Sequence, residues 1–356
     1  MTAGPTPPRP RDDRPPPFPS LASIRSALRL GYGLDAETIE EIESGADAAA
    51  RAWRVTTADG ERLFLKLRLG VRPAAILLPR HLHDLGMSQP VAALSTTAGD
   101  GWLDVDGWTA VVMPFVDGPT AIDVGLDLAG WRDLGAFAAQ LHRATLPAAL
   151  LATLGVDEFG PEATAHARRM DRLVDGLDAA ALDAESTAVR EGWLARRAVI
   201  RRLIELSEAL AASIRGRDAA ALRGSMVPCH ADLHVGNVLL EDRQIRVVDW
   251  DESILAPPER DLMFVRGSVV AGRVADEQAD AFEAGYGPYE VDRELLAHYR
   301  VDWAVQDVAG YAWEVLVRPD RVPPTRPRAR RRFDGQFEAG GQVDGALAIA
   351  AAVGLG

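Results

Sequence analysis

The sequence predicts an α+β protein with two lobes, a small one built on an antiparallel sheet and a larger one that is mostly helical. Three observations carry this prediction. The chain has 356 residues, more than one compact core usually holds. Runs of strand-forming residues fill 34–68, and the turn Asp59-Gly60 is typical of a hairpin. From about residue 127 onward, alanine, leucine and arginine recur with the period of helices.

The small lobe is expected to span 20–116. Eight prolines and the lack of apolar periodicity predict that the preceding residues 1–19 are a disordered tail outside the fold. The apolar pattern of the lobe predicts helices at about 20–29 and 72–85, and strands at 39–42, 52–56, 62–67, about 101–105 and 108–115.

The larger lobe is expected to span 117–356. Its periodicity predicts helices at about 129–144, 162–182, 187–215, 259–272, 276–284, 292–316 and 330–351. Two strand-like runs, 238–240 and 245–248, are separated by a polar turn and predict a short hairpin. We expect the basic, proline-containing stretch 318–332 to be a surface connection rather than a nucleic-acid-binding arm.

Composition narrows the class of protein. The 52 acidic side chains outnumber the 39 basic ones, which gives a net charge of −13. This balance argues against a nucleic-acid or anionic-membrane binder and suits a cationic small molecule. The single cysteine, Cys229, excludes a disulfide framework and a four-cysteine zinc site. The chain shows no apolar run long enough to span a membrane and no signal-peptide core, so we expect a cytoplasmic monomer.

One basic residue differs from all the others. Lys66 is the only lysine, and arginine fills every other cationic position. It lies on the third predicted strand of the small lobe, after a glycine-containing loop. A lysine is a compact point charge on a flexible stem and suits contact with a phosphate oxygen.

The densest polar cluster has the pattern H-x-D-x-x-x-x-N, formed by His230, Asp232 and Asn237. A strand, a turn, a second strand and Asp249 follow. This layout places Asn237 and Asp249 at neighbouring ends of a hairpin, where both oxygens can reach one hard cation such as Mg²⁺. Asp232 could then accept the proton of an attacking hydroxyl while Lys66 neutralises phosphate oxygens. Phosphoryl transfer requires this division of labour.

These segments, CHADLHVGNVLL, VVDWDE and APPERDLMF, resemble the aminoglycoside phosphotransferase family, and within it the spectinomycin phosphotransferase type. The resemblance covers about 35–350 and is most specific over 230–264. It implies a two-lobed fold like that of protein kinases, with ATP and Mg²⁺ as cofactors.

Residue by residue, the resemblance implies that Asp232 is the catalytic base and that His230 beside it orients the catalytic loop. It implies that Asn237 and Asp249 are the Mg²⁺ ligands and that Lys66 contacts the ATP phosphates. It further assigns nucleotide binding to a cover loop with Ser44, Gly45, Ala46 and Asp47, and to the backbone of 113–116 with Met113, Phe115 and Val116.

The acceptor is expected to be a small cationic molecule. Aminocyclitol and aminoglycoside antibiotics are the leading candidates, and phosphorylation of such an antibiotic would make the protein a resistance enzyme. Asp251 and Glu252 follow the predicted metal ligand and can contact a cation or lie in solvent. Trp303 and Asp307 are four residues apart on one helical stripe that either walls the acceptor pocket or packs in the core.

Three alternatives remain open. The enzyme could phosphorylate another small metabolite, such as an amino alcohol or a sugar derivative. It could be a nucleotide-binding pseudokinase, because the helix after Lys66 lacks the glutamate that would pair with the lysine, and Asp84 is its only acid. The triplet of His230, Asp232 and His234 could form a hydrolase metal site, although no second histidine cluster supports it. Asp261 is expected to fix the catalytic loop rather than react.

Overall fold

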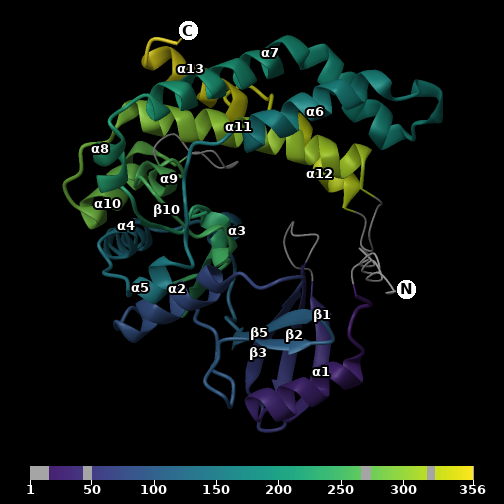
Figure 1. Cartoon of the computed structure of the whole chain (residues 1–356), viewed down its shortest axis with the longest axis vertical. Helices are drawn as coiled ribbons and strands as arrows, with labels where there is room; N and C mark the ends of the chain where they lie inside the picture. The colour runs from purple at the N-terminus through teal and green to yellow at the C-terminus, as the bar shows by residue number, and fades with distance from the viewer. Residues whose placement is uncertain (1–15, 43–49, 266–273, 319–324, 356) are drawn as a thin grey trace, which may run out of the picture. The chain divides into compact units, whose positions relative to one another are not determined.

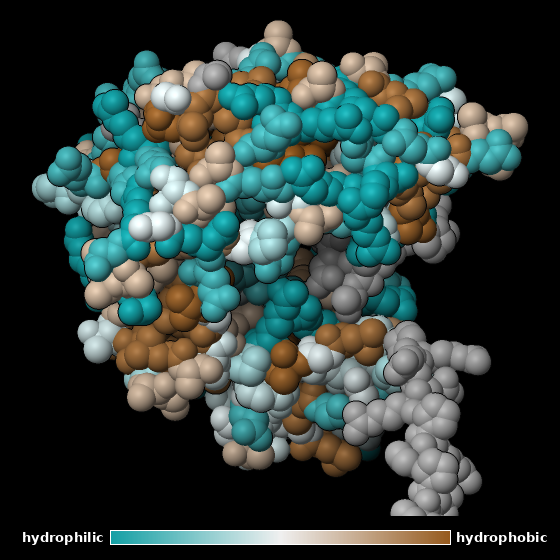
Figure 2. Space-filling view, turned by 45° about the horizontal axis from the view of Figure 1, so that its top comes forward, coloured by the Kyte–Doolittle hydropathy of each residue, from teal (hydrophilic) through white to brown (hydrophobic). Residues whose placement is uncertain are grey.

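The computed structural model describes residues 16–42, 50–265, 274–318 and 325–355. The chain packs into two compact units, residues 1–117 and 118–356, each described here by itself (Figure 1). In the view of Figure 2, hydrophilic residues cover most of the surface, and hydrophobic residues form separate patches between them. Among the described residues, no helix combines the length and the apolar character needed to cross a membrane.

The first unit is built on a five-stranded antiparallel sheet, in agreement with the prediction. The strands follow the order β1 (Ala36–Ile42), β2 (Ala50–Thr57), β3 (Arg62–Arg68), β5 (Trp108–Pro114) and β4 (Leu103–Val105). The predicted Asp-Gly turn joins β2 and β3, and Gly60 there has a φ of +88°, which a residue with a Cβ rarely adopts.

The two faces of this sheet differ. Leu63, Leu65 and Leu67 alternate along β3 and point to a buried core, because successive side chains of a strand lie on opposite faces. Helix α1 (Leu21–Ala27) and the π-helical turn η1 (Leu28–Tyr32) cover that core. The opposite face carries Lys66 between Phe64 and Arg68.

The last four residues of the predicted disordered tail, 16–19, are ordered and pack against the sheet. Residues 1–15 of that predicted tail lie outside the described residues. The Phe18 ring stacks on Trp53 at 5.3 Å and meets Trp108 edge-on at 4.9 Å. The Trp108 Nε1–H donates a hydrogen bond to the Pro17 carbonyl at 3.2 Å. Proline density predicts an irregular backbone, which this segment has, but it does not exclude packing by a single aromatic ring.

The second unit is mostly helical. Its long helices are α4 (Leu128–His142), α6 (Glu162–Gly176), α7 (Ala184–Arg215), α10 (Asp276–Tyr286), α11 (Arg293–Leu316), α12 (Arg326–Gly335) and α13 (Gln342–Ala352). Helix α11 packs against α6, α7, α12 and α13, and the side chains between them form one core (Figure 1).

Three predicted helices end or break earlier than expected. The helix predicted for 259–272 is the single turn α9 (Glu259–Leu262), and 266–273 lie outside the described residues. The helix predicted for 330–351 is two helices, because the chain turns at Gly340 with a φ of +66°. The helix predicted for 162–182 ends at Gly176. In addition, α12 occupies much of 318–332, which was expected to be a connection.

Short strands position the candidate site. The predicted hairpin forms from β8 (Val238–Glu241) and β9 (Gln244–Val247). A three-stranded sheet of β6 (Gly155–Val156), β10 (Ile254–Ala256) and β7 (Val227–Cys229) was not predicted. Its strands have two or three residues each, too few to show a periodic pattern in the sequence.

Candidate active site

The loop 230–237 carries most of the candidate catalytic side chains. It follows β7, which is fixed by antiparallel pairing with β10, and it ends in the 3-10 turn η3 (Val235–Asn237) before β8. Ala231 has a φ of 66°, a left-handed conformation that costs a residue with a Cβ about 1 kcal/mol. Contacts from elsewhere must therefore hold the loop in this shape.

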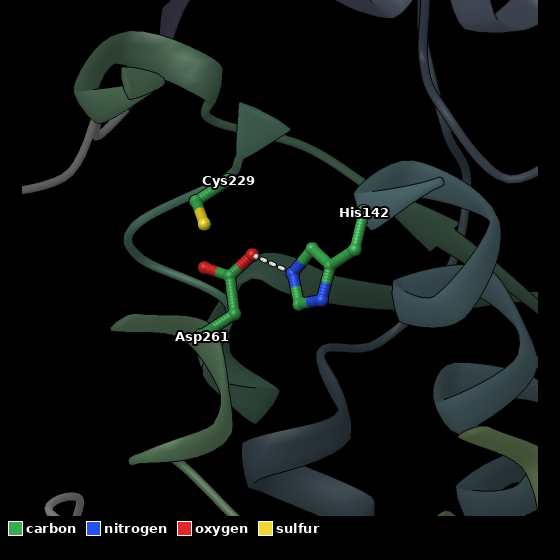
Figure 3. Close-up of side chains that lie close together, drawn as sticks. All are labelled: His142, Cys229 and Asp261. Atoms are coloured by element: carbon green, nitrogen blue, oxygen red, sulfur yellow. Dashed lines mark hydrogen bonds and ion pairs between the residues drawn. The ribbon is translucent and has the colours of Figure 1, made fainter. Parts of the chain in front are cut away.

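Asp261 on α9 supplies these contacts. Its carboxylate accepts hydrogen bonds from the backbone N–H groups of His230 at 3.0 Å and Ala231 at 2.7 Å. His142 Nε2–H donates a third at 3.0 Å (Figure 3). Burial by itself raises the pKa of Asp261, but the hydrogen bonds that its carboxylate accepts, from His142 first and also from the Ala231 backbone, hold the pKa below its usual value. Asp261 therefore anchors the loop, as the sequence analysis expected.

His142, Cys229 and Asp261 lie close enough together to suggest a metal site, with candidate ligand atoms within 4.8 Å of one another (Figure 3). Their hydrogen bonds indicate a structural cluster instead. His142 Nδ1 accepts from the Tyr286 hydroxyl at 2.7 Å, and the Cys229 thiol points to the carbonyl of Ala256 at 3.5 Å. Burial raises the pKa of Cys229 well above its usual value, so the thiol stays protonated, whereas a metal ligand must be a thiolate.

His230 ties two loops together. Its ring is buried beside Trp250, with ring centroids 4.6 Å apart. Nε2–H donates to the Val248 carbonyl at 3.0 Å, and Nδ1 accepts from the Asp232 N–H at 3.3 Å. This pattern requires a neutral ring, and burial lowers the pKa of His230. The expectation that His230 orients the loop fits this geometry, and its side chain has no nitrogen left for chemistry.

Asp232 and Asn237 bind each other directly. Asn237 Nδ2 donates to Asp232 Oδ2 at 2.7 Å and to the Asp232 carbonyl at 2.9 Å. Both amide hydrogens are therefore used, and Oδ1 of Asn237 is directed away from Asp232. Burial raises the pKa of Asp232 to about 7; the Asn237 hydrogen bond opposes this rise and the charge of Asp249 adds to it. This pKa suits a group that exchanges protons near neutral pH.

Asp249 lies at the same end of the β8–β9 hairpin as Asn237. The Val248 N–H donates to the Asn237 carbonyl at 3.0 Å, which extends the pairing of Val238 with Val247 by one step. The register thus brings the two predicted metal ligands together. Asp249 has a φ of 61°. Strained residues of this kind persist where surrounding contacts over-determine them.

His234 lies beside the candidate base. Its Nδ1 accepts from the Gly236 N–H at 2.9 Å, and its Nε2 lies 3.5 Å from Asp232 Oδ1. Burial lowers the pKa of His234 to about 4, so the ring is neutral at pH 7. The triplet of His230, Asp232 and His234 does not form a hydrolase metal site among these residues, because His230 already uses both ring nitrogens in hydrogen bonds.

In the first unit, Lys66 lies on β3 opposite Ala52 of β2 and Val111 of β5. Residues paired across strands share a face, so Lys66 stands on the sheet face away from the α1 core. Asp84, the only acid of helix α2 (Pro73–Asp84), pairs with Arg80 of the same helix at 3.2 Å. Asp84 therefore has a partner on its own helix, and helix α2 carries no other acid that could pair with Lys66.

The predicted nucleotide-binding backbone 113–116 follows the same sheet. Met113 pairs with Phe64, and the Phe115 N–H donates to the Arg62 carbonyl at 3.1 Å. The Phe115 N–H is therefore used in pairing with β3. The N–H of Val116 makes no hydrogen bond with another described residue. The other predicted nucleotide-binding residues, Ser44, Gly45, Ala46 and Asp47, lie outside the described residues.

The candidate acceptor residues fall into two groups. Asp251 and Glu252 form the 3-10 turn η4 (Trp250–Glu252) directly after Asp249, with Asp251 half-buried and Glu252 exposed. Trp303 and Asp307 lie on α11 and are half-buried. The two groups belong to separate elements, and only the first adjoins the predicted metal ligands in sequence.

An aromatic chain links α11 to the catalytic loop. The Phe264 ring packs edge-on to Trp303 at 5.0 Å and lies 5.8 Å from the His234 ring. Burial raises the pKa of Asp307 to about 7, while the charge of Arg332 and the hydrogen bonds of Gln342, Tyr311 and Trp303 lower it. Trp303 and Asp307 are therefore neither fully buried in the core nor fully exposed to solvent.

Sequence reasoning missed Arg260. Its guanidinium lies 5.4 Å from the Trp303 ring and 5.6 Å from the Tyr299 ring, and its charge lowers the pKa of Asp232. In the sequence, Arg260 stands between two acids, Glu259 and Asp261, and the structure shows that both acids are buried. The sequence alone does not indicate in which direction the Arg260 side chain points.

A family model described as the phosphotransferase enzyme family matches residues 38–300. The chain belongs to this family. This phosphotransferase is also similar to solved structures of spectinomycin phosphotransferase. One, in complex with ADP and spectinomycin, is 27% identical with a TM-score of 0.82, covering 92% of this chain and 98% of that chain. Another, bound to AMP, is 26% identical with a TM-score of 0.79 and the same coverage.

A structure of amicoumacin kinase in complex with AMP-PNP, Ca²⁺ and Ami is 14% identical with a TM-score of 0.59, covering 89% of this chain and 94% of that chain; it supports the fold alone. No curated protein sequence matches the chain. The predicted family, the kinase-like fold and the phosphotransferase activity are thereby confirmed. The ADP and AMP in the two spectinomycin phosphotransferase structures agree with the predicted use of ATP.

Proposed function

We propose that this phosphotransferase transfers the γ-phosphate of ATP to a hydroxyl of a small cationic molecule, with an aminocyclitol of the spectinomycin type as the first candidate. The observation that carries the proposal is the mutual orientation of Asp232 and Asn237 beside Asp249 at one end of a hairpin. We expect the enzyme to act as a cytoplasmic monomer. It would then be an antibiotic-resistance enzyme.

The residues present suit a divalent cation. Asn237 Nδ2 is committed to Asp232, so its Oδ1 is the free amide oxygen, and Asp249 adds a carboxylate. Amide and carboxylate oxygens, completed by water and phosphate, are the donors that Mg²⁺ prefers. When bound, the ion neutralises phosphate charge and holds the phosphates in line. Asn237 and Asp249 are the residues that would hold it.

Asp232 is the proposed base. Its Oδ2 accepts from Asn237, so Oδ1 is the oxygen that faces the acceptor. The acceptor hydroxyl gives its proton to Oδ1 as its oxygen forms a bond to phosphorus and the bond between the γ-phosphorus and the bridging oxygen of ADP breaks. His230 and Asp261 keep the loop in place during this step without touching the reacting atoms.

Nucleotide binding is assigned to the first unit. Lys66 supplies a point charge for phosphate oxygens, and the N–H of Val116 is a donor available to the adenine ring. Ser44, Gly45, Ala46 and Asp47 remain the proposed cover of the phosphates.

Acceptor binding is assigned to the second unit. Asp251 and Glu252 bring two acids next to the proposed metal ligands, and Trp303 with Asp307 offers an aromatic face beside a carboxylate. Ammonium groups bind well to this combination of charge and π-surface. The net charge of −13 further favours a cationic acceptor.

The experiment that tests the proposal is a transfer screen with purified protein, ATP and Mg²⁺. The acceptors are spectinomycin, aminoglycosides, macrolides and short amino alcohols, and the readout is a mass gain of one phosphate. Transfer to spectinomycin or an aminoglycoside supports the proposal. Transfer only to an amino alcohol or a sugar derivative would replace the acceptor class. Nucleotide binding with no transfer to any acceptor would favour the pseudokinase alternative.

A further inference from the structure

A cavity of about 490 Å³ lies in the second unit among α9, α10 and the first turn of α11. Residues from 262–265, residues from 282–291 and Leu296 line it. Tyr286, which donates to His142 in the structural cluster described above, is one of them, but none of these residues has a proposed catalytic, metal-binding or acceptor-binding role. Cavities of roughly 300 to 1,000 Å³ commonly hold small molecules. Figure 1 shows α9, α10 and α4 gathered in this part of the unit.

The lining of the cavity indicates the chemistry of an occupant. Phe282, Tyr286 and Tyr289 contribute three aromatic rings, with Phe282 stacked on Tyr286 at 6.0 Å and Tyr289 edge-on to Tyr286 at 5.8 Å. The remaining wall is largely aliphatic, and among the described residues of the lining Glu283 alone carries a charge. Aromatic walls favour a ring-bearing ligand, and an acidic lining disfavours an anion.

Two wall residues are bonded to the segment that holds the catalytic loop. The Tyr286 hydroxyl donates to His142 Nδ1 at 2.7 Å, and His142 Nε2–H donates to Asp261 at 3.0 Å. Asp261 in turn accepts the N–H groups of His230 and Ala231. An unbroken chain of hydrogen bonds therefore runs from the cavity wall to the loop.

The second connection runs through the start of α9. The Tyr289 hydroxyl donates to Glu259 Oε1 at 2.8 Å, and the Asp292 N–H donates to the same oxygen at 2.8 Å. Glu259 is fully buried. Leu262, at the other end of α9, lines the cavity directly. The short helix that carries Asp261 is thus bonded to the cavity wall at its first residue, through Tyr289, and its last residue, Leu262, forms part of that wall.

We propose that this cavity binds an uncharged aromatic small molecule and that its binding stabilises the catalytic loop 230–231. We assume that the loop opens only when α9 moves and that the ligand binds only while the cavity wall is intact. The ligand then lowers the population of the open loop by a factor of one plus the ligand concentration divided by its Kd. Any effect on turnover rests on the proposed function. Binding and loop protection do not, so they are measured without an activity assay.

The binding test uses 6-fluoroindole and 6-fluoroquinoline, observed by ¹⁹F NMR on the full-length protein. Ala284 lines the cavity and is solvent-exposed, so Ala284→Trp fills the cavity without disturbing the core. Asp280→Trp places the same ring at an exposed position of α10 outside the lining and is the matched control. We expect saturable binding by the parent and by Asp280→Trp and at least a tenfold weaker binding by Ala284→Trp. Binding by neither probe, or equal binding by Ala284→Trp, would overturn the site.

The coupling test uses amide hydrogen exchange of peptides that contain residues 230 and 231. At a probe concentration of nine times its Kd, exchange of these amides should slow about tenfold. Peptides of α7 should change little, because their protection does not depend on α9. Tyr286→Phe keeps the ring and removes the hydroxyl, so it should retain probe binding and lose most of the slowing. Binding that leaves exchange at 230–231 unchanged, or equal slowing in Tyr286→Phe, would overturn the coupling.

Discussion

Asn237 Nδ2 donates hydrogen bonds to both the side chain and the backbone carbonyl of Asp232, at 2.7 and 2.9 Å. The proposed base and the proposed metal ligand therefore set each other's orientation. A change at either residue acts on both, because Asp232 loses a partner if Asn237 is truncated, and the Asn237 oxygen is free to turn if Asp232 is removed. Effects of the two substitutions should accordingly be non-additive.

Asp232→Asn removes the proton acceptor and keeps the shape of the side chain. We expect kcat for phosphate transfer to fall at least about a hundredfold, while the Kd for ATP changes less than about threefold. Steady-state kinetics and nucleotide titration measure the two quantities on the same preparation. Equal turnover by the variant and the parent would remove Asp232 from the mechanism.

Asp249→Asn removes one negative charge from the proposed metal ligands. The Mg²⁺ concentration that gives half-maximal activity should rise about tenfold or more, because a neutral amide oxygen binds a hard cation more weakly than a carboxylate. Asp242→Asn removes the same charge at the turn of the same hairpin, where Asp242 is exposed with a φ of 48°, and should leave the titration unchanged. An identical shift in both variants would mean that general charge, not ligation, is measured.

Lys66→Met should raise the KM for ATP on the order of tenfold or more and leave the thermal stability close to that of the parent. Met preserves the stem of Lys66 on the sheet face and deletes only the ammonium. Arg62→Met removes an exposed cation from the same strand and is the control. An unchanged KM for ATP in Lys66→Met would assign phosphate binding to other residues.

Asp261→Asn should destabilise the protein by about 1 to 3 kcal/mol, because an amide has one acceptor oxygen in place of two and leaves buried N–H donors unsatisfied. Urea unfolding monitored by circular dichroism measures the change. Asp280→Asn, on the exposed side of α10, should change the free energy of unfolding by less than about 0.5 kcal/mol. A loss below about 1 kcal/mol in Asp261→Asn would contradict the anchoring role.

Asp307 should make stability fall as pH rises. Burial raises its pKa to about 7 in the folded protein, against 3.8 for an ordinary aspartate, although Arg332, Gln342, Tyr311 and Trp303 lower it. Between these values the unfolded chain releases the proton first, so the folded state loses up to about 4 kcal/mol relative to low pH.

Asp307→Asn cannot ionise and tests this sign directly. Its free energy of unfolding should match that of the parent near pH 4 and exceed it near pH 7.5, as measured by urea titration at each pH. A variant that is less stable than the parent at both pH values would show that the carboxylate is ionised in the folded protein and engaged by Arg332.

The shape of the loop and the nearness of Asn237 to Asp249, the proposed metal ligands, were predictable because both depend on local geometry. His230, Asp232 and Asn237 share one loop, and a two-stranded hairpin of fixed register returns the chain to Asp249. Short-range rules of strands and turns are enough to place such residues together. The antiparallel sheet of the first unit was predictable for the same reason, since its Asp-Gly turn joins adjacent strands.

The anchoring of the loop was only partly predictable. Asp261 was expected to fix the catalytic loop, but its partner His142 is 119 residues away and carries no local signal. Strands β6, β7 and β10 were missed because two or three residues show no period, and they form only through pairing of distant segments. Arg260 was missed because its direction depends on rings of α11.

Phe18 has a practical consequence for anyone who shortens the protein. The proline-rich start invites removal as far as the first helix, yet Phe18 covers the indoles of Trp53 and Trp108 and carries the Arg51 guanidinium 4.1 Å from its ring centroid. A chain trimmed to Leu21 would expose two large apolar surfaces at once and invite aggregation on expression. A truncation that removes only residues before Pro16 keeps the packing of Phe18 on Trp53 and Trp108.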